Sequence, residues 1–211
     1  MKYVIMCACP SGVTRPRQMI DVCGETLIER TIRLLSENGV EDIAISTHHP
    51  AFDALGVPIL AHDNGYYDGA GLWVDAFCPL NEPACYVFGD VLFSPEAIRK
   101  IVQTETDDVE FFASAPPFGD HYAKQWAEPF AFKVVNQDHF RICIDQVREL
   151  WKAGKFNRPP IAWELWQVIK NTPLNVIFYN NYMAINDYTC DIDEGDAMPQ
   201  WGFLEKWRSK Q

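Results

Sequence analysis

Short, almost continuously apolar segments alternate with amphipathic stretches in the first half of this chain. Residues 2–8 and 84–88 are apolar runs typical of strands that are buried on both faces of a parallel sheet. Between the first run and a further apolar run at 40–49, residues 25–39 carry apolar side chains at helical spacing and end at Gly39. A strand, a helix and a strand in this order predict a βαβ unit with parallel strands.

The remaining elements follow from the same periodicities. Ser94, Pro95 and Glu96 are a typical beginning of a helix. The chain shows no repeat, low-complexity segment or linker, so we predict one α/β domain over residues 1–211. The other predicted strands are 57–63, 108–115, 129–135 and, at or near a sheet edge, 176–187; the other predicted helices are 94–105, 140–156, 161–171, one after Gly71 and one at the C-terminus.

Composition excludes several classes of protein. The formal net charge of −11 argues against nucleic-acid binding, which needs clustered Lys and Arg. No apolar run approaches the roughly 20 residues of a membrane span, and the apolar run at the N-terminus is read as a strand of the fold and not as a signal peptide. Seven cysteines without a CxxC pair argue against a disulfide framework or a structural zinc site. These observations predict a protein of the reducing cytoplasm.

Asp90 follows the apolar run 84–88 with only Gly89 between them. One interpretation is a turn aspartate that accepts hydrogen bonds from nearby backbone amides. The other is a metal ligand at the carboxyl end of a sheet strand, where α/β folds bind ligands.

A second acidic motif lies near the C-terminus. Asp191 and Asp193 are two residues apart, so in extended backbone their carboxylates face the same side. Two such carboxylates repel unless a cation or proton lies between them, and hard oxygen ligands suit Mg²⁺. Taken alone, this motif is more typical of an acidic loop in an acidic protein than of a metal site.

The loop after the first strand reads CPSGVTRPRQ. A loop between a strand and a helix can present backbone N–H groups to a phosphate, and Arg15 and Arg17 would add bidentate donors. An ordinary connection with two solvated arginines explains the same residues.

Three segments together resemble the small nucleotidyltransferases that make activated sugars and alcohols. They are PRQMIDVCGETLIERTIRLLSENGVEDIAI at 16–45, FGDVLFS at 88–94 and CDIDEGDAM at 190–198. The resemblance implies a three-layer α/β/α sandwich with a mostly parallel sheet, similar to type A glycosyltransferases. It also implies that a phosphate monoester attacks the α-phosphorus of a nucleoside triphosphate (CTP, or UTP or GTP) and that pyrophosphate is released.

The resemblance assigns roles to individual residues. Asp90, Asp191 and Asp193 would hold Mg²⁺, and Arg15 and Arg17 would hold the β- and γ-phosphates. The further nucleotide contacts would be Ala8, Ser11, Gly12, Asn64 and Gly89. For the acceptor, a sugar 1-phosphate or a phosphocholine-like compound, the candidates are Lys124, Glu128, Lys133, Trp163 and Glu164.

Some of these residues have a second explanation. Trp163 and Trp166 lie three apart on one helical face and are equally typical of a core. Lys133, flanked by apolar residues, can extend its charge to the surface. His48 and His49 face opposite ways on an extended chain and are assigned no role.

The first loop departs from the family pattern. It keeps only Gly12, with Cys9 and Pro10 where glycines let the backbone approach phosphate, and Arg17 replaces the usual lysine. A non-catalytic nucleotide-binding protein is therefore one alternative. A type A glycosyltransferase is another, although its Asp-x-Asp motif normally lies near mid-chain.

Overall fold

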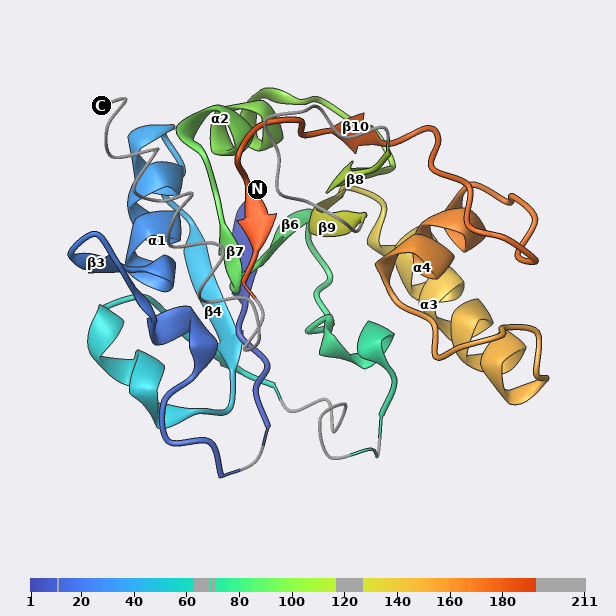
Figure 1. Ribbon diagram of the computed structural model, residues 1–211, viewed down its shortest axis with the longest axis horizontal. Coiled ribbons are helices and arrows are strands. Elements are labelled where there is room, and N and C mark those ends of the chain that lie inside the picture. Colours follow the sequence, from blue (N-terminus) through green and yellow to red (C-terminus); the bar gives the residue numbers. More distant parts are fainter. Residues whose placement is uncertain (11, 63–68, 70, 117–126, 193–211) are drawn as a thin grey trace.

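A seven-stranded sheet forms the centre of the computed structural model, which describes residues 1–10, 12–62, 69, 71–116 and 127–192 (Figure 1). The strand order is β10-β8-β9-β6-β1-β4-β5. Only β9 runs antiparallel to its neighbours, which confirms the mostly parallel sheet. The strands are β1 (Lys2–Met6), β4 (Ile43–Thr47), β5 (Ile59–Ala61), β6 (Ala84–Phe88), β8 (Val109–Ser114), β9 (Glu128–Val134) and β10 (Met183–Ala184).

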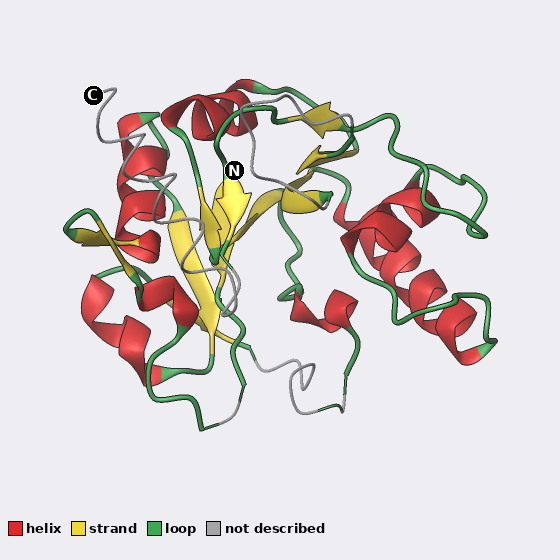
Figure 2. Cartoon of the chain, in the orientation of Figure 1, coloured by secondary structure: helices red, strands yellow, loops and turns green. Residues whose placement is uncertain are grey.

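Two pairs of helices cover the sheet. Helices α1 (Leu27–Glu37) and α2 (Pro95–Gln103) pack together on one side, and α3 (Gln137–Lys152) and α4 (Ala162–Ile169) pack together on the other (Figures 1 and 2). The three-layer arrangement and the βαβ unit β1-α1-β4 are as predicted. The short elements are 3₁₀ turns η1 (Arg17–Met19), η2 (Pro50–Leu55) and η3 (Trp73–Ala76), and ribbons of β2 (Asp21–Val22) with β3 (Glu25–Thr26) and β7 (Val91–Leu92) with β11 (Cys190–Asp191).

Aromatic side chains fill the layer between the sheet and the α3–α4 pair. Phe111 of β8 and Phe132 of β9 stack with ring centroids 4.4 Å apart. Trp163 and Trp166 of α4 pack against Phe111, and both are almost completely buried. The tryptophan pair therefore belongs to the core, as its helical spacing also allowed.

The predicted strand over 176–187 is wrong for most of its length, because only Met183–Ala184 pairs, at the sheet edge beside β8. The preceding segment bonds to α4 instead. Trp166 Nε1 donates to the carbonyl of Asn180 at 3.1 Å, and the Gln167 side-chain amide donates to the carbonyl of Val176 at 2.8 Å. Carbonyls that accept from helix side chains are turned away from a strand ladder.

Two further predictions about the elements have different outcomes. The helix expected after Gly71 is only the four-residue turn η3, whose start is tied by a hydrogen bond from the Leu72 backbone N–H to Asp75. The helix expected at the C-terminus lies outside the described residues. Within the described ranges, no helix is long and apolar enough to cross a membrane.

Candidate functional site

The order of the parallel strands reverses at β1, which has β4 on one side and β6 on the other. In open α/β sheets, ligands bind at such a reversal, outside the carboxyl ends of the strands. The Gly89 backbone N–H donates to the carbonyl of Met6 at 3.0 Å, so the end of β6 is joined directly to the end of β1. The sequence motif Gly89-Asp90 therefore lies at this reversal.

Gly89 is required by close packing. A Cβ atom built at this position would lie 2.7 Å from Cys7 Sγ and 2.7 Å from the carbonyl oxygen of Met6. Both distances are too short for real atoms, so any other residue would force β6 away from the loop after β1. The glycine thus fixes how closely Asp90 approaches that loop.

Asp90 faces Arg17, the first residue of η1. Its Oδ2 is 3.6 Å from Arg17 Nη1, and the two side chains are 23% and 22% exposed. Arg15, in contrast, is exposed, and its Nε and Nη2 donate to the carbonyl of Met19 at 3.2 and 2.7 Å. The structure therefore brings Arg17, but not the guanidinium of Arg15, to the carboxylate of Asp90.

The second acidic motif reaches the same place. Strand β11 pairs antiparallel with β7, so that Asp191 lies opposite Val91. The Ile192 backbone N–H donates to the carbonyl of Asp90 at 3.0 Å. The backbones of two motifs far apart in the sequence therefore meet at Asp90 and Ile192, while Asp193 lies outside the described residues.

Glu128 of β9 bonds to the backbone of β11. Its Oε2 accepts a hydrogen bond from the Asp191 backbone N–H at 3.1 Å. A register shift between Phe112 and Ala113 of β8 marks a bulge where β9 begins, and bulges of this kind re-aim side chains beside functional sites. Glu128, predicted as an acceptor contact, therefore lies against the backbone of β11.

The residues present offer hard oxygen donors to a divalent cation. Asp90 is partly exposed, and Asp191 lies on β11, which pairs with the strand that directly follows Asp90. Both side chains are carboxylates, the type of ligand that Mg²⁺ prefers. Among the described residues, no three His, Cys, Asp or Glu side chains are grouped closely enough to hold a metal by themselves. A cation here would need further oxygens from substrate, water or Asp193, which is how Mg²⁺ is usually bound.

The structure describes only some of the other residues that were predicted to contact the nucleotide or the acceptor. Ala8 is half-buried in the loop after β1, and Gly12 in that loop has a φ of +79°, which favours glycine. Ser11, Asn64 and Lys124 lie outside the described residues.

Lys133 is not brought to the crevice. It is 4% exposed, and its Nζ donates to the carbonyls of Val102 and Thr104 at 3.0 and 2.7 Å, at the end of α2. It lies beside Val134, which pairs with Ala84 at the amino end of β6, the opposite edge of the sheet. Burial lowers the pKa of the Lys133 ammonium. The lysine therefore supplies hydrogen-bond donors to the carbonyls at the C-terminal end of α2.

Replacing Lys133 by Met is expected to lower the free energy of unfolding by about 1–3 kcal/mol, because two carbonyls at the end of α2 lose their donor. The KM for any acceptor should stay unchanged, since the ammonium is far from the crevice. Urea unfolding and steady-state kinetics measure the two effects. An unchanged stability with a raised acceptor KM would return Lys133 to the acceptor site.

Trp163 and Glu164 have structural partners. Trp163 is 2% exposed, and its Nε1 lies 3.4 Å from the carbonyl of Ala127. Glu164 accepts from Arg158 Nε at 2.8 Å and from the Ile161 backbone N–H at 3.0 Å, which caps the first turn of α4. Neither side chain is brought to Asp90.

His49 is a contact that the sequence argument missed. Its Nδ1 accepts from the Ala51 backbone N–H at 3.1 Å, so Nε2 carries the proton and donates to the carbonyl of Val13 at 2.8 Å. The histidine therefore ties the loop after β1 to the end of β4. Its position directly after a strand that neighbours β1 was the available signal.

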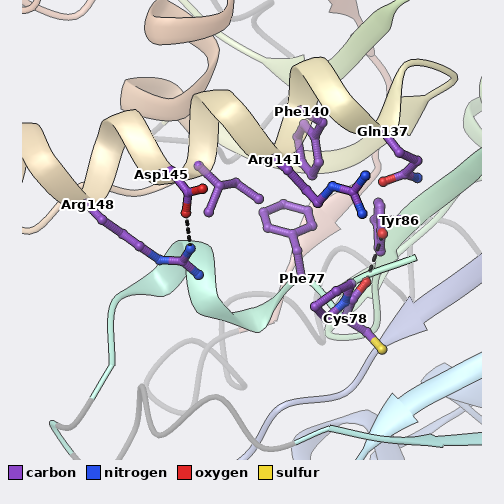
Figure 3. A pocket seen from close by; sticks show the side chains of 10 residues that line it. Phe77, Cys78, Tyr86, Gln137, Phe140, Arg141, Asp145 and Arg148 are labelled. Carbon is purple, nitrogen blue, oxygen red and sulfur yellow. Dashed lines mark hydrogen bonds and ion pairs between the residues drawn. The ribbon is translucent and has the colours of Figure 1, made fainter. Parts of the chain in front are cut away.

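A small cavity lies elsewhere, between α3 and the segment that follows η3 (Figure 3). Its volume is about 130 Å³, well below the roughly 300 Å³ at which ligand pockets begin. Arg148, on its wall, is paired with Asp75 and Asp145. Neither Asp90 nor Arg17 lines it, so the cavity is separate from the crevice.

Sheet order, helical layers and the strand reversal define a nucleotidyltransferase-like fold, and solved structures share it. One is the 4-diphosphocytidyl-2C-methyl-D-erythritol synthase of Anaerococcus prevotii, with a TM-score of 0.57, 12% identity, and 97% of this chain and 95% of that chain covered. Another is a putative glucose-1-phosphate thymidylyltransferase of Bacillus anthracis, with a TM-score of 0.54, 14% identity, and 96% and 94% covered.

A third similar structure is the protein Rv0371c of Mycobacterium tuberculosis H37Rv, with a TM-score of 0.52, 15% identity, and 97% of each chain covered. No family model matches the chain, and no curated protein matches it. At these identities the similarity establishes the fold, and the chemistry has to be argued from the residues of the crevice.

Proposed function

We propose that this protein is a nucleotidyltransferase that transfers a nucleoside monophosphate from a nucleoside triphosphate to a small phosphorylated acceptor, with release of pyrophosphate. The observation that carries the proposal is the meeting of Asp90, Arg17 and the Asp191 strand at the reversal between β1 and β6. Two of the structures with this fold are named as a 4-diphosphocytidyl-2C-methyl-D-erythritol synthase and a putative glucose-1-phosphate thymidylyltransferase, which supports the reaction class.

The main barrier to the proposed reaction is electrostatic repulsion between the two phosphate groups. The acceptor phosphate is already a nucleophile, so the residues must chiefly bring two anions together and stabilise the leaving pyrophosphate. A bound Mg²⁺ would supply part of that neutralisation. Asp90 and Asp191, with Asp193, are the proposed ligands, and a manganese complex of Rv0371c supports a divalent cation in this fold.

The remaining roles go to residues around the crevice. Arg17 is proposed to hold the triphosphate, assisted by backbone N–H groups of the loop at Ala8, Ser11 and Gly12. Glu128 and, from outside the described residues, Lys124 are the proposed acceptor contacts, with Asn64 near the base. Lys133, Trp163, Glu164 and Arg15 are left out because the structure engages them elsewhere.

The base and the acceptor are proposed only as classes: CTP, UTP or GTP, and a sugar 1-phosphate or an alcohol phosphate such as phosphocholine. We place the protein in a reducing compartment such as the cytoplasm. All seven cysteines lie in the described part of the chain, five of them are buried, and a buried cysteine behaves as a small apolar residue.

The test is pyrophosphate release with each of the four nucleoside triphosphates, Mg²⁺ and a panel of sugar and alcohol phosphates. We expect acceptor-dependent release with one triphosphate, and a higher melting temperature with the same one, because a ligand that binds only the native state stabilises it. Stabilisation without release would instead support a non-catalytic nucleotide-binding protein, to which the single glycine of the first loop points. Hydrolysis of a nucleotide sugar would support a glycosyltransferase.

A further inference from the structure

We propose that Thr189 and Asp187 are positioning residues that hold strand β11 in register and thereby place Asp191 beside Asp90. They do so through hydrogen bonds to Ser94, the N-cap residue of α2. We call Ser94, Asp187 and Thr189 the α2 junction. Its link to metal binding rests on the proposed function, whereas its effect on β11 does not.

Ser94 donates to both other members of the α2 junction. Thr189 is 0% exposed, and its Oγ1 accepts from the Ser94 backbone N–H at 3.0 Å. Asp187 accepts from Ser94 Oγ at 2.5 Å and from the Thr189 backbone N–H at 2.7 Å. Ser94 Oγ in turn accepts from the Ala97 backbone N–H at 2.9 Å, as an N-cap.

Electrostatics favour Asp187 at this place. The beginning of α2 is the positive end of the helix dipole, which attracts a carboxylate. On the other side of Ser94, Arg30 Nε donates to the Phe93 carbonyl at 3.2 Å, so the segment that leads from β7 into α2 is held as well. The junction therefore joins the segment before β11 to the segment between β7 and α2, which Arg30 holds in place.

Strand β11 needs such support because its own pairing is minimal. Among the described residues it pairs with β7 at Cys190 and Asp191, and a two-residue ribbon is not stable by itself. A slip of one residue would turn every side chain of β11 to the opposite face. Thr189 lies directly before this ladder, so its bond to Ser94 favours the register that is formed.

The register matters for the site because Asp191 supplies a proposed ligand. With Thr189 held, the Ile192 N–H reaches the carbonyl of Asp90, and the Asp191 N–H reaches Glu128. The burial of Cys190 and Ile192 in a small apolar cluster with Leu27 and Leu92 favours the same face, and the junction adds a fixed point directly before this short ladder. The junction thus contributes to cation affinity without contacting the cation.

The test compares Thr189→Val with a matched control, Thr31→Val. Thr31 is 1% exposed, and its hydroxyl donates to the Leu27 carbonyl inside α1, so the change removes one equally buried hydroxyl away from the junction. Thr189→Ser keeps the hydroxyl and is the rescue variant. Two quantities are measured in the full-length protein: the dissociation constant of Mn²⁺, and hydrogen exchange of the amides of Asp191 and Ile192.

We expect Thr189→Val to accelerate exchange at Asp191 and Ile192 and to weaken Mn²⁺ binding at least fivefold. Thr31→Val and Thr189→Ser should stay within twofold of wild type in both. Unchanged exchange in Thr189→Val, or an equal loss of Mn²⁺ affinity in Thr31→Val, overturns the proposal. If wild type binds no Mn²⁺ while exchange accelerates, the junction's control of β11 is upheld and the proposed function is what fails.

Discussion

Asp90→Asn is expected to lower kcat for pyrophosphate release by about 10²–10³-fold, because the amide keeps the size of the side chain and removes the charge that holds the cation. An electrostatic contact made at the developing charge is worth several kcal/mol, and each 1.36 kcal/mol is a factor of ten in rate. Stability should change little, since Asp90 is partly exposed and its ion pair with Arg17 is long at 3.6 Å. Steady-state kinetics and urea unfolding measure the two quantities.

The control for this variant is Asp107→Asn, which neutralises an exposed aspartate in a turn away from the crevice. It reproduces the change in net charge and should leave kcat unaffected. Full Mg²⁺-dependent turnover by Asp90→Asn would mean that the proposed site is in the wrong place. A large loss of stability instead would assign Asp90 to the turn, the alternative that the sequence also allowed.

Arg17→Gln should raise the KM for the nucleoside triphosphate about tenfold or more and leave the KM for the acceptor nearly unchanged. A hydrogen bond to a charged group contributes about 1.5–3 kcal/mol, which corresponds to a factor of ten or more. The same variant should bind Mn²⁺ more tightly in the absence of nucleotide, because Arg17 no longer neutralises Asp90. The guanidinium therefore opposes the cation before nucleotide binds.

Arg15→Gln is the matched comparison for Arg17→Gln. Its guanidinium bonds to the Met19 carbonyl, so its loss should alter the triphosphate KM less than that of Arg17 and should not tighten Mn²⁺ binding. Equal effects of Arg17→Gln on both substrates would remove Arg17 from the triphosphate site. Weaker Mn²⁺ binding in that variant would show that the ion pair with Asp90 does not compete with the cation.

Local patterns predicted the parts of the fold that depend on local physics. Apolar runs predicted β1, β4 and β6, because a strand buried on both faces needs apolar side chains throughout. Helical spacing predicted α1, and Ser94 predicted the beginning of α2, where the cap forms as expected, whereas the cap of α1 at Thr26 was not predicted. The strand predicted at the sheet edge is wrong for most of its length, because the side chains of Trp166 and Gln167 donate to backbone carbonyls of that segment.

Among the candidate residues, position relative to a strand end was the reliable signal. Gly89-Asp90 and Arg17 come together because both follow parallel strands whose carboxyl ends share one edge. Residue type alone was a weaker guide. Lys133 and Glu164 carry charges suited to a phosphorylated acceptor, yet each completes the backbone hydrogen bonds of a helix end.

By itself the sequence determined an α/β chain with parallel strands and an aspartate at the end of its most apolar strand, since periodicity and burial are properties of neighbouring residues. Only the tertiary structure decided that β11 pairs beside Asp90 and that His49 joins the end of β4 to the loop after β1. It also decided that Trp163 and Trp166 belong to the core. These contacts join residues far apart in the chain. A local pattern states which face of a segment is buried and does not state which distant segment covers it.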